Sequence, residues 1–169
     1  MCVFFRIKTK WHLLMESPQN HIWGPALWTL LHSSAERIGL QQLKRLPQEE
    51  SRIWINLLSS LRYSLPCPLC KKHFTAYFSN NPIVHVEKDS IREWLFQLHE
   101  RVNQQTSKPY TITIDALPEI YGIPFQYTVY SKTVSTHMIL AMRKGWCSRE
   151  DVQRTIRCME ELRRFYDFF

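Results

Sequence analysis

Two cysteines separated by two residues are the pair of side chains best placed to do chemistry in this sequence. Cys67 and Cys70 lie in the segment SLPCPLCKKHF, residues 64–74, and His73 follows one helical turn later. Pro68 suits the first turn of a helix, which places Cys67 beside unpaired backbone N–H groups and the positive end of the helix dipole. Such a position favours the thiolate, which is the attacking species in disulfide exchange. The segment therefore predicts a redox-active cysteine pair.

Zinc binding and inert burial are the alternatives for this pair. Cys67, Cys70 and His73 offer three possible zinc ligands, and His85 or His99 would supply a fourth. Structural zinc sites usually combine two short motifs, and no second Cys-x-x-Cys or His-x-x-x-His follows. Five cysteines are an odd number and too few for a disulfide scaffold. The redox interpretation is favoured, and both alternatives stay open.

The composition is that of a folded, mainly helical protein. The chain has 169 residues, enough for one domain with an extension, and 44% of them are hydrophobic. Only four glycines are present, which disfavours a turn-rich β architecture. The formal net charge of +7 favours encounters with acidic partners without specifying one. Arg6, Lys8 and Lys10 interrupt the apolar N-terminal segment, so we expect no signal peptide, no membrane span and a soluble protein.

Apolar residues recur at helical spacing along most of the chain, and proline, glycine and capping residues mark the ends of the helices. Pro25 is expected in the first turn of the first helix, and Asp89 or Ser90 at the cap of the fourth. Residues 109–124 alternate apolar and polar side chains, which predicts extended chain or a short strand. The expected helices cover about 25–38, 47–65, 68–79, 90–102, 130–144 and 149–167.

Aromatic and imidazole side chains share helix faces near the cysteine pair. Trp28 and His32 are four residues apart, and His99, Val102 and Asn103 lie on one face of a later helix. Each group alone is typical of ordinary core packing. A dithiol, however, must pass two electrons onward, and no side chain transfers them to oxygen. A cofactor is therefore implied, and planar rings of this kind could line its site.

Four motifs occur in a fixed order over residues 21–108, and together they resemble the Erv/ALR family of FAD-linked sulfhydryl oxidases. The family patterns are W-G-x-x-x-W-x-x-L-H, P-C-x-x-C-x-x-H-F, N-x-P, and W-x-x-x-L-H-x-x-V-N with a lysine five residues on. The matching residues are Trp23, Gly24, Trp28, Leu31, His32, Pro66, Cys67, Cys70, His73, Phe74, Asn80, Pro82, Trp94, Leu98, His99, Val102, Asn103 and Lys108.

The resemblance implies an all-α protein whose four-helix bundle, residues 21–108, holds FAD, usually in a homodimer packed through the first helices. Residues 1–20 are then an N-terminal segment, and residues 109–169 a mainly helical C-terminal extension of unknown role. Two departures from the family are visible. Leu65 stands where the family often has an aromatic residue, and no cysteine soon after Lys108 matches the family's second disulfide. The divergent extension favours a viral member.

The resemblance also implies roles for individual residues. Cys67 and Cys70 would be catalytic, with Cys70 against the flavin ring and Cys67 exchanging with substrate. Lys108 would face the phosphates or the adenosine portion of FAD. No metal site is implied. The residues that would contact FAD are Trp23, Gly24, Trp28, His32, His73, Phe74, His99, Val102, Asn103 and Lys108.

The activity implied is oxidation of protein dithiols to disulfides. A reduced substrate would attack the disulfide at Cys67, and Cys70 would pass two electrons to FAD and then to O₂, which yields hydrogen peroxide. The substrate would be a dithiol protein, such as a thioredoxin-like or small relay protein. The expected location is the cytoplasm, meaning the host cytoplasm or the virion for a viral protein. The mitochondrial intermembrane space is the alternative.

A basic C-terminal third offers a competing hypothesis, nucleic-acid binding on two helices. Four acidic residues, Glu150, Asp151, Glu160 and Glu161, dilute this charge, as is common on solvated helix faces. Nucleic acid is therefore an unlikely partner. The basic residues are Arg143, Lys144, Arg149, Arg154, Arg157, Arg163 and Arg164.

Cys147 and Cys158 are not expected to pair. Gly145 ends one helix, and Ser148 with Asp151 forms a capping box that starts the next, which should run unbroken past Cys158. The two cysteines would then be roughly 16 Å apart along the helix axis, too far for a disulfide. Cys158 is expected to be a buried hydrophobic residue. Cys147 is expected to be a reactive thiol that could, with Cys2, relay electrons to Cys67.

Overall fold

The structure is a computed structural model, and it describes residues 17–41, 43–108 and 112–168. Within these ranges the chain is helical and contains no strand, which confirms the predicted all-α fold class. Residues 1–16, with Cys2 and most of the expected N-terminal segment, lie outside the described residues. The elements are α2 Asn20–Ala35, α3 Pro47–Ser64, α4 Pro68–Asn80, α5 Lys88–Gln105, the 3₁₀-helix η1 Ile114–Ala116, α6 Leu117–Tyr121, α7 Tyr127–Arg143 and α8 Arg149–Phe165.

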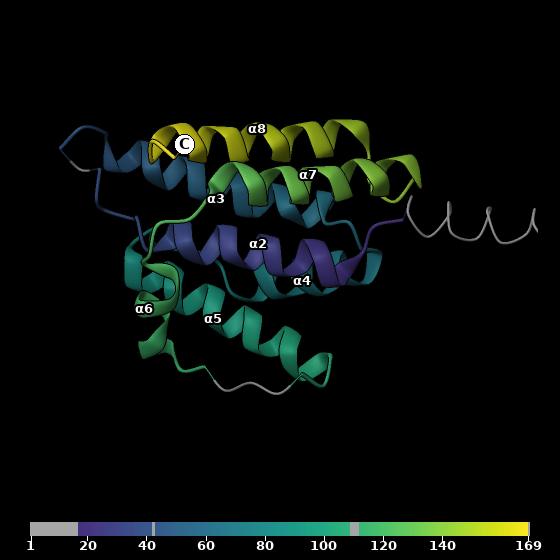
Figure 1. The fold of residues 1–169 in the computed structure, drawn as a ribbon, viewed down its shortest axis with the longest axis horizontal. Coiled ribbons are helices and arrows are strands. Elements are labelled where there is room, and N and C mark those ends of the chain that lie inside the picture. The colour runs from purple at the N-terminus through teal and green to yellow at the C-terminus, as the bar shows by residue number, and fades with distance from the viewer. Residues whose placement is uncertain (1–16, 42, 109–111, 169) are drawn as a thin grey trace, which may run out of the picture.

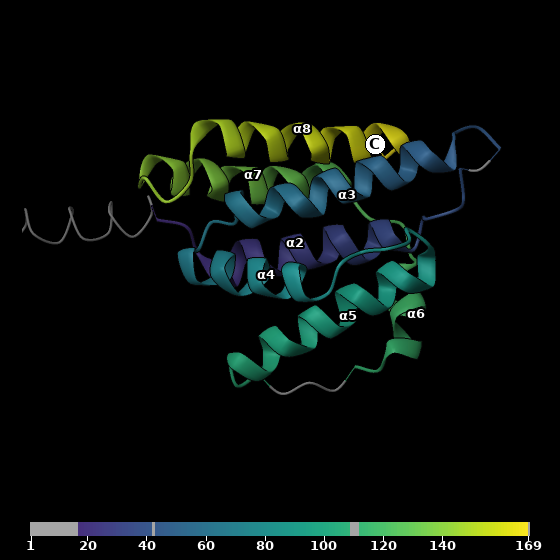
Figure 2. The ribbon, with the colours of Figure 1, turned by 180° about the vertical axis from the view of Figure 1, so that it is seen from behind.

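The helices α2 to α5 are the four expected between residues 21 and 108, and the last two helices pack directly onto them. Helix α8 runs along α3, and α7 runs along α2 (Figure 1). Helix α4 packs on α3, and α5 packs on α2, with the short α6 beside α2 and η1 (Figure 2). Helices α7 and α8 of the C-terminal extension therefore lie against α2 and α3, on the side of the molecule away from α5, while η1 and α6 lie on the same side as α5.

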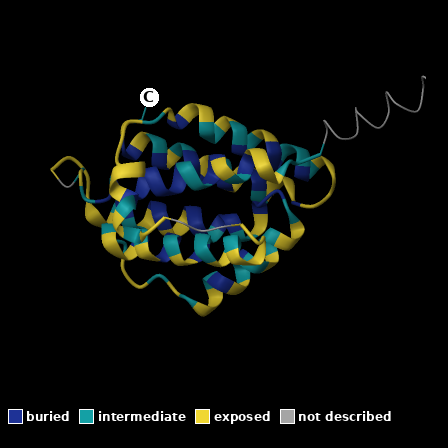
Figure 3. Ribbon diagram, turned by 60° about the horizontal axis from the view of Figure 1, so that its bottom comes forward, coloured by how far each residue is buried: buried dark blue, intermediate teal, exposed yellow. Residues whose placement is uncertain are grey.

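One hydrophobic core connects the two parts of the chain. Buried side chains line the inward faces of α2, α3, α7 and α8 (Figure 3). Residues up to 108 and residues after 108 share this core in space. The division at residue 108 therefore stays a prediction, which separates the residues that carry the family motifs from the extension. Its fully or almost fully buried members include Leu30, Leu31, Trp54, Leu57, Leu58, Leu61, Ile91, Leu95, Val134, Met138, Ala141, Val152, Met159 and Leu162.

Polar side chains also link helices, in one case across the two parts of the chain and in the other within residues 21–108. Thr155 donates a hydrogen bond from Oγ1 to Ser64 Oγ at 2.7 Å, which joins α8 to the end of α3. Arg92 on α5 holds Glu36, at the end of α2, through Nε and Nη2 at 2.8 and 2.7 Å. Buried hydrogen bonds of this kind fix the register of helices that apolar packing alone would leave free to slide.

Most helix boundaries lie within about three residues of those predicted, among them the start of α7 at Tyr127, and three differences bear on the predictions. Helix α2 begins at Asn20, one turn before Pro25, so the expectation that Pro25 lies in the first turn was wrong. The turn before Pro25 forms because the N–H groups of Ile22 and Trp23 both donate to Gln19 O. Helix α5 begins at Lys88, just before the expected cap.

The third difference is the segment after Lys108. Residues 114–121 form η1 and α6, so the prediction of extended chain there was wrong, while residues 109–111 lie outside the described residues. Alternation suggested a strand, but Asp115 and Glu119 stand in the first turns of these short helices and Pro118 near the start of α6. Those positions stabilise helix N-termini.

The prediction for the last helix was correct. Ser148 is the N-cap of α8 and accepts a hydrogen bond from the Asp151 N–H at 3.1 Å. The helix continues through Cys158 to Phe165, and Cys147 and Cys158 are both free thiols. Cys158 is buried, as expected of a small hydrophobic residue.

Candidate redox and cofactor site

The candidate site begins with a disulfide between Cys67 and Cys70, whose Cα atoms are 5.1 Å apart. Cys67 is the N-cap of α4, and its Sγ accepts a hydrogen bond from the Cys70 N–H at 3.1 Å. Pro68 occupies the first turn, as the sequence predicts, because its ring suits the start of a helix. The sulfur of Cys67 therefore lies at the positive end of the helix, where a thiolate formed by reduction is stabilised.

A second group of site residues stacks where α2 faces α5. The rings of Trp28 and His99 are parallel, with centroids 3.9 Å apart. Nε2 of His32 and Nδ1 of His99 are 3.3 Å apart and share a hydrogen bond. The ring of Tyr121, from α6, stacks on His32 at 4.7 Å. Four planar rings from three helices are thus brought together.

Both imidazoles in this group are held neutral. Burial lowers the pKa of His32 to about 3, with a smaller contribution from the neighbouring His99. Burial lowers the pKa of His99 to about 4, and the positive charge of Lys108 lowers it further. The charge of Lys108 is therefore close enough to act on this group. Neutral imidazoles present flat, weakly polar surfaces.

The remaining candidate residues have different surroundings. Trp23 is buried and donates from Nε1 to Asn20 Oδ1 at 3.1 Å. Phe74 is buried in the core, edge-on to Trp94, while His73 on the same helix is only half-buried. A Cβ added to Gly24 would meet no atom within 4 Å, so there is open space beside this glycine.

The end of α5 carries the last three candidates. Val102 and Asn103 are half-buried, and Lys108 is exposed. The N–H of Lys108 donates to Asn103 O at 3.0 Å, which folds the chain after α5 back over its last turn. The positive charge of Lys108 acts on His99, whose pKa it lowers.

The residues present fit a dinucleotide such as FAD. Such a molecule has two planar ring systems and a pyrophosphate, and the chain places neutral aromatic rings, open space beside Gly24 and the cation of Lys108 around the α2–α5 contact. Trp28, His99 and Tyr121 are half-buried, so part of each ring surface remains accessible. Aromatic surfaces with a few polar groups are typical of cofactor sites.

Sequence reasoning missed two residues close to these groups. Tyr121 stacks on His32, but the sequence predicts extended chain for its segment, which carries no motif. Lys71, next to Cys70, donates from its ammonium to Trp146 O, 75 residues away. No local spacing could reveal either contact, since each depends on where a distant element packs.

Cys147 does not have the character expected of it. Its side chain is buried, and its thiol donates to Leu65 O at 3.5 Å. Burial raises the pKa of the Cys147 thiol, and this effect outweighs the opposing influence of the nearby Lys71. These two observations argue against the expected reactive thiol, because tertiary packing buries the Cys147 side chain although residues 143–146 and 148–150 around it are exposed.

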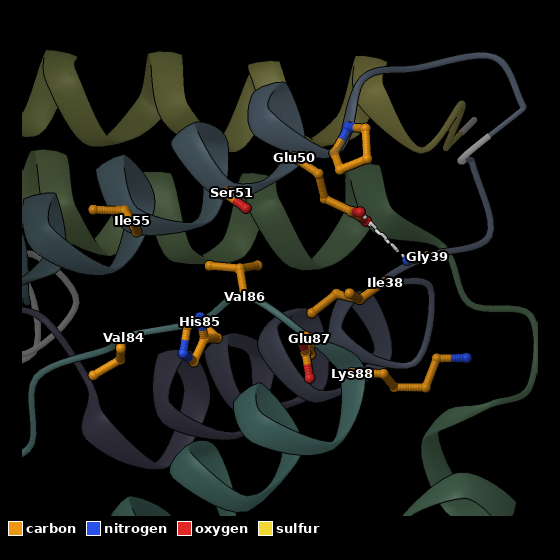
Figure 4. Close-up of a pocket in the computed structure, with 11 residues that line it drawn as sticks. Ile38, Gly39, Glu50, Ser51, Ile55, Val84, His85, Val86, Glu87 and Lys88 are labelled. Atoms are coloured by element: carbon orange, nitrogen blue, oxygen red, sulfur yellow. Dashed lines mark hydrogen bonds between the residues drawn. The ribbon is translucent and has the colours of Figure 1, made fainter.

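A cavity with described walls lies away from both groups. It has a volume of about 490 Å³ and lies between the start of α3 and residues 84–88 (Figure 4). Glu50 reaches into this region and accepts from the Gly39 N–H at 3.1 Å. The lining of this cavity contains none of the candidate site residues.

The alternatives to redox chemistry gain no support from the geometry. Among the described residues no cluster of three or more His, Cys, Asp or Glu side chains could hold a metal ion. Acidic neighbours pair with part of the basic surface of α8. Arg163 and Arg164 bind Glu160 at 2.8 and 3.0 Å, and Arg154 binds Asp151 at 3.4 Å. In the described part of the chain, no helix is long and apolar enough to cross a membrane.

Comparisons with known proteins point to one family. Residues 25–118 match the family described as Erv1 / Alr. The chain is 31% identical over 88 residues to an FAD-linked sulfhydryl oxidase of African swine fever virus (isolate Pig/Kenya/KEN-50/1950), covering 51% of this chain and 69% of the relative. It is 27% identical over 95 residues to the mitochondrial FAD-linked sulfhydryl oxidase ERV1 of Saccharomyces cerevisiae, covering 56% and 48%.

A plant relative shows the same pattern. The chain is 27% identical over 85 residues to the FAD-linked sulfhydryl oxidase ERV1 of Arabidopsis thaliana, covering 50% of this chain and 42% of that protein. No solved structure matches the chain significantly. The family match covers more than half of the sequence, begins within α2, includes both cysteines of the disulfide and continues past the end of α5. The chain therefore belongs to the Erv1/Alr family.

Proposed function

We propose that this protein is an FAD-linked sulfhydryl oxidase that forms disulfides in protein substrates. The observation that carries the proposal is the Cys67–Cys70 disulfide at the N-terminus of α4, in a chain of the Erv1/Alr family. The curated relatives that match it are named as FAD-linked sulfhydryl oxidases. Cys67 and Cys70 are the proposed catalytic residues.

The thiol chemistry is a double exchange. A substrate thiolate attacks Sγ of Cys67, the Cys67–Cys70 bond breaks, and Cys70 leaves as a thiolate. The second substrate thiolate then attacks the substrate sulfur joined to Cys67, which closes the substrate disulfide and releases Cys67 as a thiolate. The substrate loses two electrons and two protons, and the cysteine pair gains the two electrons.

The position of Cys67 favours the second exchange. A thiolate leaves faster when its conjugate thiol is more acidic. The leaving sulfur of Cys67 is the one that accepts the Cys70 N–H, at 3.1 Å, and lies at the positive end of the α4 dipole. The same backbone that holds the disulfide therefore stabilises the product of its reduction.

FAD, when bound, supplies the acceptor for the two electrons and passes them to O₂, with hydrogen peroxide as product. The chain's contribution is to bind and orient it. Trp28, His32 and His99 would face its planar rings, and Lys108 would neutralise phosphate charge. The other proposed contacts are Trp23, Gly24, His73, Phe74, Val102 and Asn103. No metal is needed for this chemistry.

The proposed partners follow from the reaction. A protein dithiol is the electron donor, such as a thioredoxin-like or small relay protein, and O₂ is the acceptor. The homodimer implied by the resemblance stays a prediction, and its interface must avoid the faces of α2 and α3 that α7 and α8 cover. The viral relative favours the host cytoplasm or the virion as location, and the yeast relative favours mitochondria.

The test of the function is direct. The purified protein is expected to be yellow, with about one FAD per chain, because each chain has one proposed FAD site. It should consume O₂ when given dithiothreitol, and Cys67→Ser and Cys70→Ser should each abolish this uptake. A folded, colourless protein that FAD does not reconstitute and that leaves dithiothreitol unoxidised would exclude the proposal.

The roles of the two cysteines can be tested separately. If Cys70 lies against the flavin, Cys67→Ser should leave a lone Cys70 thiolate and show a long-wavelength charge-transfer absorption band. Cys70→Ser should lack that band. The band in the Cys70→Ser protein instead would reverse the assignment.

A further inference from the structure

The turn between α7 and α8 is held against the backbone that carries the redox pair. The carbonyl oxygen of Leu65 accepts the Cys67 N–H at 2.8 Å and also the Cys147 thiol at 3.5 Å. On the other side, the Lys71 N–H donates to Cys67 O at 2.9 Å, and the Lys71 ammonium donates to Trp146 O. Leu65 and Lys71, which contact this turn, are thus each hydrogen-bonded to the backbone of Cys67.

A cleft lies between this turn, the end of α3 and the start of α4. Its volume is about 370 Å³. Tyr63 and Trp146 on its wall keep 45% and 39% of their surface exposed, and Leu69, between the two redox cysteines, keeps 60%. Two large, partly apolar side chains are therefore solvent-accessible on the cleft wall, and Leu69, outside the lining, exposes a third within the redox motif. The lining residues are Arg62, Tyr63, Lys71, Gly145, Trp146, Cys147, Ser148 and Asp151.

The charges on this cleft favour an acidic ligand. The ammonium of Lys71 bonds to a carbonyl, and the guanidinium of Arg62 lies over the rings of Tyr63 and Phe78 at 5.6 and 5.2 Å. In the described part of the chain neither cation is paired with a carboxylate. Asp151, the one acidic residue of the lining, binds Ser148 and Arg154.

We propose that this cleft binds the polypeptide that flanks the dithiol of a protein substrate, with an apolar residue against Tyr63 and Trp146 and an acidic residue near Arg62 and Lys71. The inference rests on the proposed oxidase function. A substrate thiol must reach Cys67, so the chain attached to that thiol must cross the adjoining surface. The wall formed by residues 145–151 lies outside the part of the chain that matches the family, residues 25–118. Substrate selection would thus be a property of this chain's own extension.

The experiment compares substrates that share one dithiol. The probes are a Cys-Gly-Gly-Cys peptide preceded by Asp-Trp, the same peptide preceded by Gly-Ser, and dithiothreitol. The variant is Trp146→Ala in the full chain with FAD bound, which keeps the backbone carbonyl that accepts from Lys71. The matched control is Val129→Ala, which shortens an exposed apolar side chain on α7, outside the cleft lining.

We expect the wild type to prefer the Asp-Trp peptide, with the ratio of its kcat/KM to that of dithiothreitol falling at least about fivefold in Trp146→Ala. Val129→Ala should keep the wild-type ratio, and Trp146→Phe should restore most of it. Raising the ionic strength should raise KM for the Asp-Trp peptide more than for the Gly-Ser peptide.

Three outcomes would overturn the docking site. The first is no preference of the wild type between the peptides. The second is an equal loss on all substrates in Trp146→Ala, which would mean that the turn only supports the disulfide. The third is a dimer that Trp146→Ala dissociates, which would assign the cleft to a second copy of the chain. Failure of the oxidase proposal looks different, because the wild type would then not oxidise dithiothreitol either.

Discussion

Trp54 donates its indole N–H to the phenol oxygen of Tyr166 at 2.8 Å, across 112 residues of sequence. The Tyr166 hydroxyl in turn donates to Glu50 at 2.6 Å, and the same carboxylate accepts the Gly39 N–H. All three side chains are buried, so the network supplies hydrogen-bond partners to polar groups that water does not reach. It ties the end of the chain, just after α8, to the start of α3.

Tyr166→Phe should therefore destabilise the protein more than its single lost oxygen suggests. The change leaves the Trp54 N–H without its acceptor and Glu50 with one donor fewer, and we expect the free energy of unfolding to fall by about 1–3 kcal/mol. Chemical denaturation monitored by circular dichroism measures this. Tyr63→Phe, at an exposed tyrosine, should change stability by about 0.5 kcal/mol or less. Equal effects of the two substitutions would show that the buried network contributes nothing.

The ion pair between Arg92 and Glu36 should be equally sensitive to the loss of one partner. Glu36 is 7% exposed, so Arg92→Met leaves a buried carboxylate without its bidentate partner. We expect a loss of about 3 kcal/mol in the free energy of unfolding, and a smaller loss for Arg92→Lys, which keeps the charge. The control is Arg52→Met, because Arg52 and Glu161 form an exposed pair worth about 1 kcal/mol or less. The same denaturation series would contradict this prediction if the two methionine variants matched.

Stability should decrease as the pH falls below about 6.5. The pKa of His32 is lowered from 6.5 to about 3 by burial, so between these values the unfolded state binds a proton that the folded state does not. A depressed pKa contributes stability above the unfolded value and loses it as the pH falls, with a slope of up to about 1.4 kcal/mol per pH unit. Denaturation at pH 6.5 and 5.0, where carboxylates are still mostly ionised, measures it. His32→Asn should have a smaller slope, and an unchanged slope would exclude His32 as a source.

The free cysteines should react slowly in the native protein. Burial raises the pKa of both the Cys147 and the Cys158 thiols, and each pKa unit lowers the thiolate fraction about tenfold. We expect alkylation by iodoacetamide at pH 8 to be at least about tenfold slower than in denatured protein. Peptide mapping without reduction should find Cys67 joined to Cys70 and both other thiols free. If Cys147 were labelled as fast in the native protein as in denatured protein, its side chain would not stay buried in solution.

The sequence by itself determined the features that depend on local spacing. The disulfide spans three residues and the N-cap of α4 precedes a proline, so both could be predicted from the segment 64–74. Trp28 and His32 share a helix face because they are four residues apart. Helices α3, α4 and α8 begin and end close to the predicted residues, since proline and capping residues act within one turn.

Only the tertiary structure decided which distant residues meet. Tyr121 stacks on His32, and Trp146 and Cys147 lie beside the backbone of Cys67, across 75 to 89 residues of sequence. The burial of Cys147 likewise follows from α7 and α8 packing on α2 and α3. An apolar helix face indicates that this face will be buried, but it does not determine which other helix packs against it. Shape and volume complementarity across the whole core choose the partner, and no local spacing in the sequence encodes that complementarity.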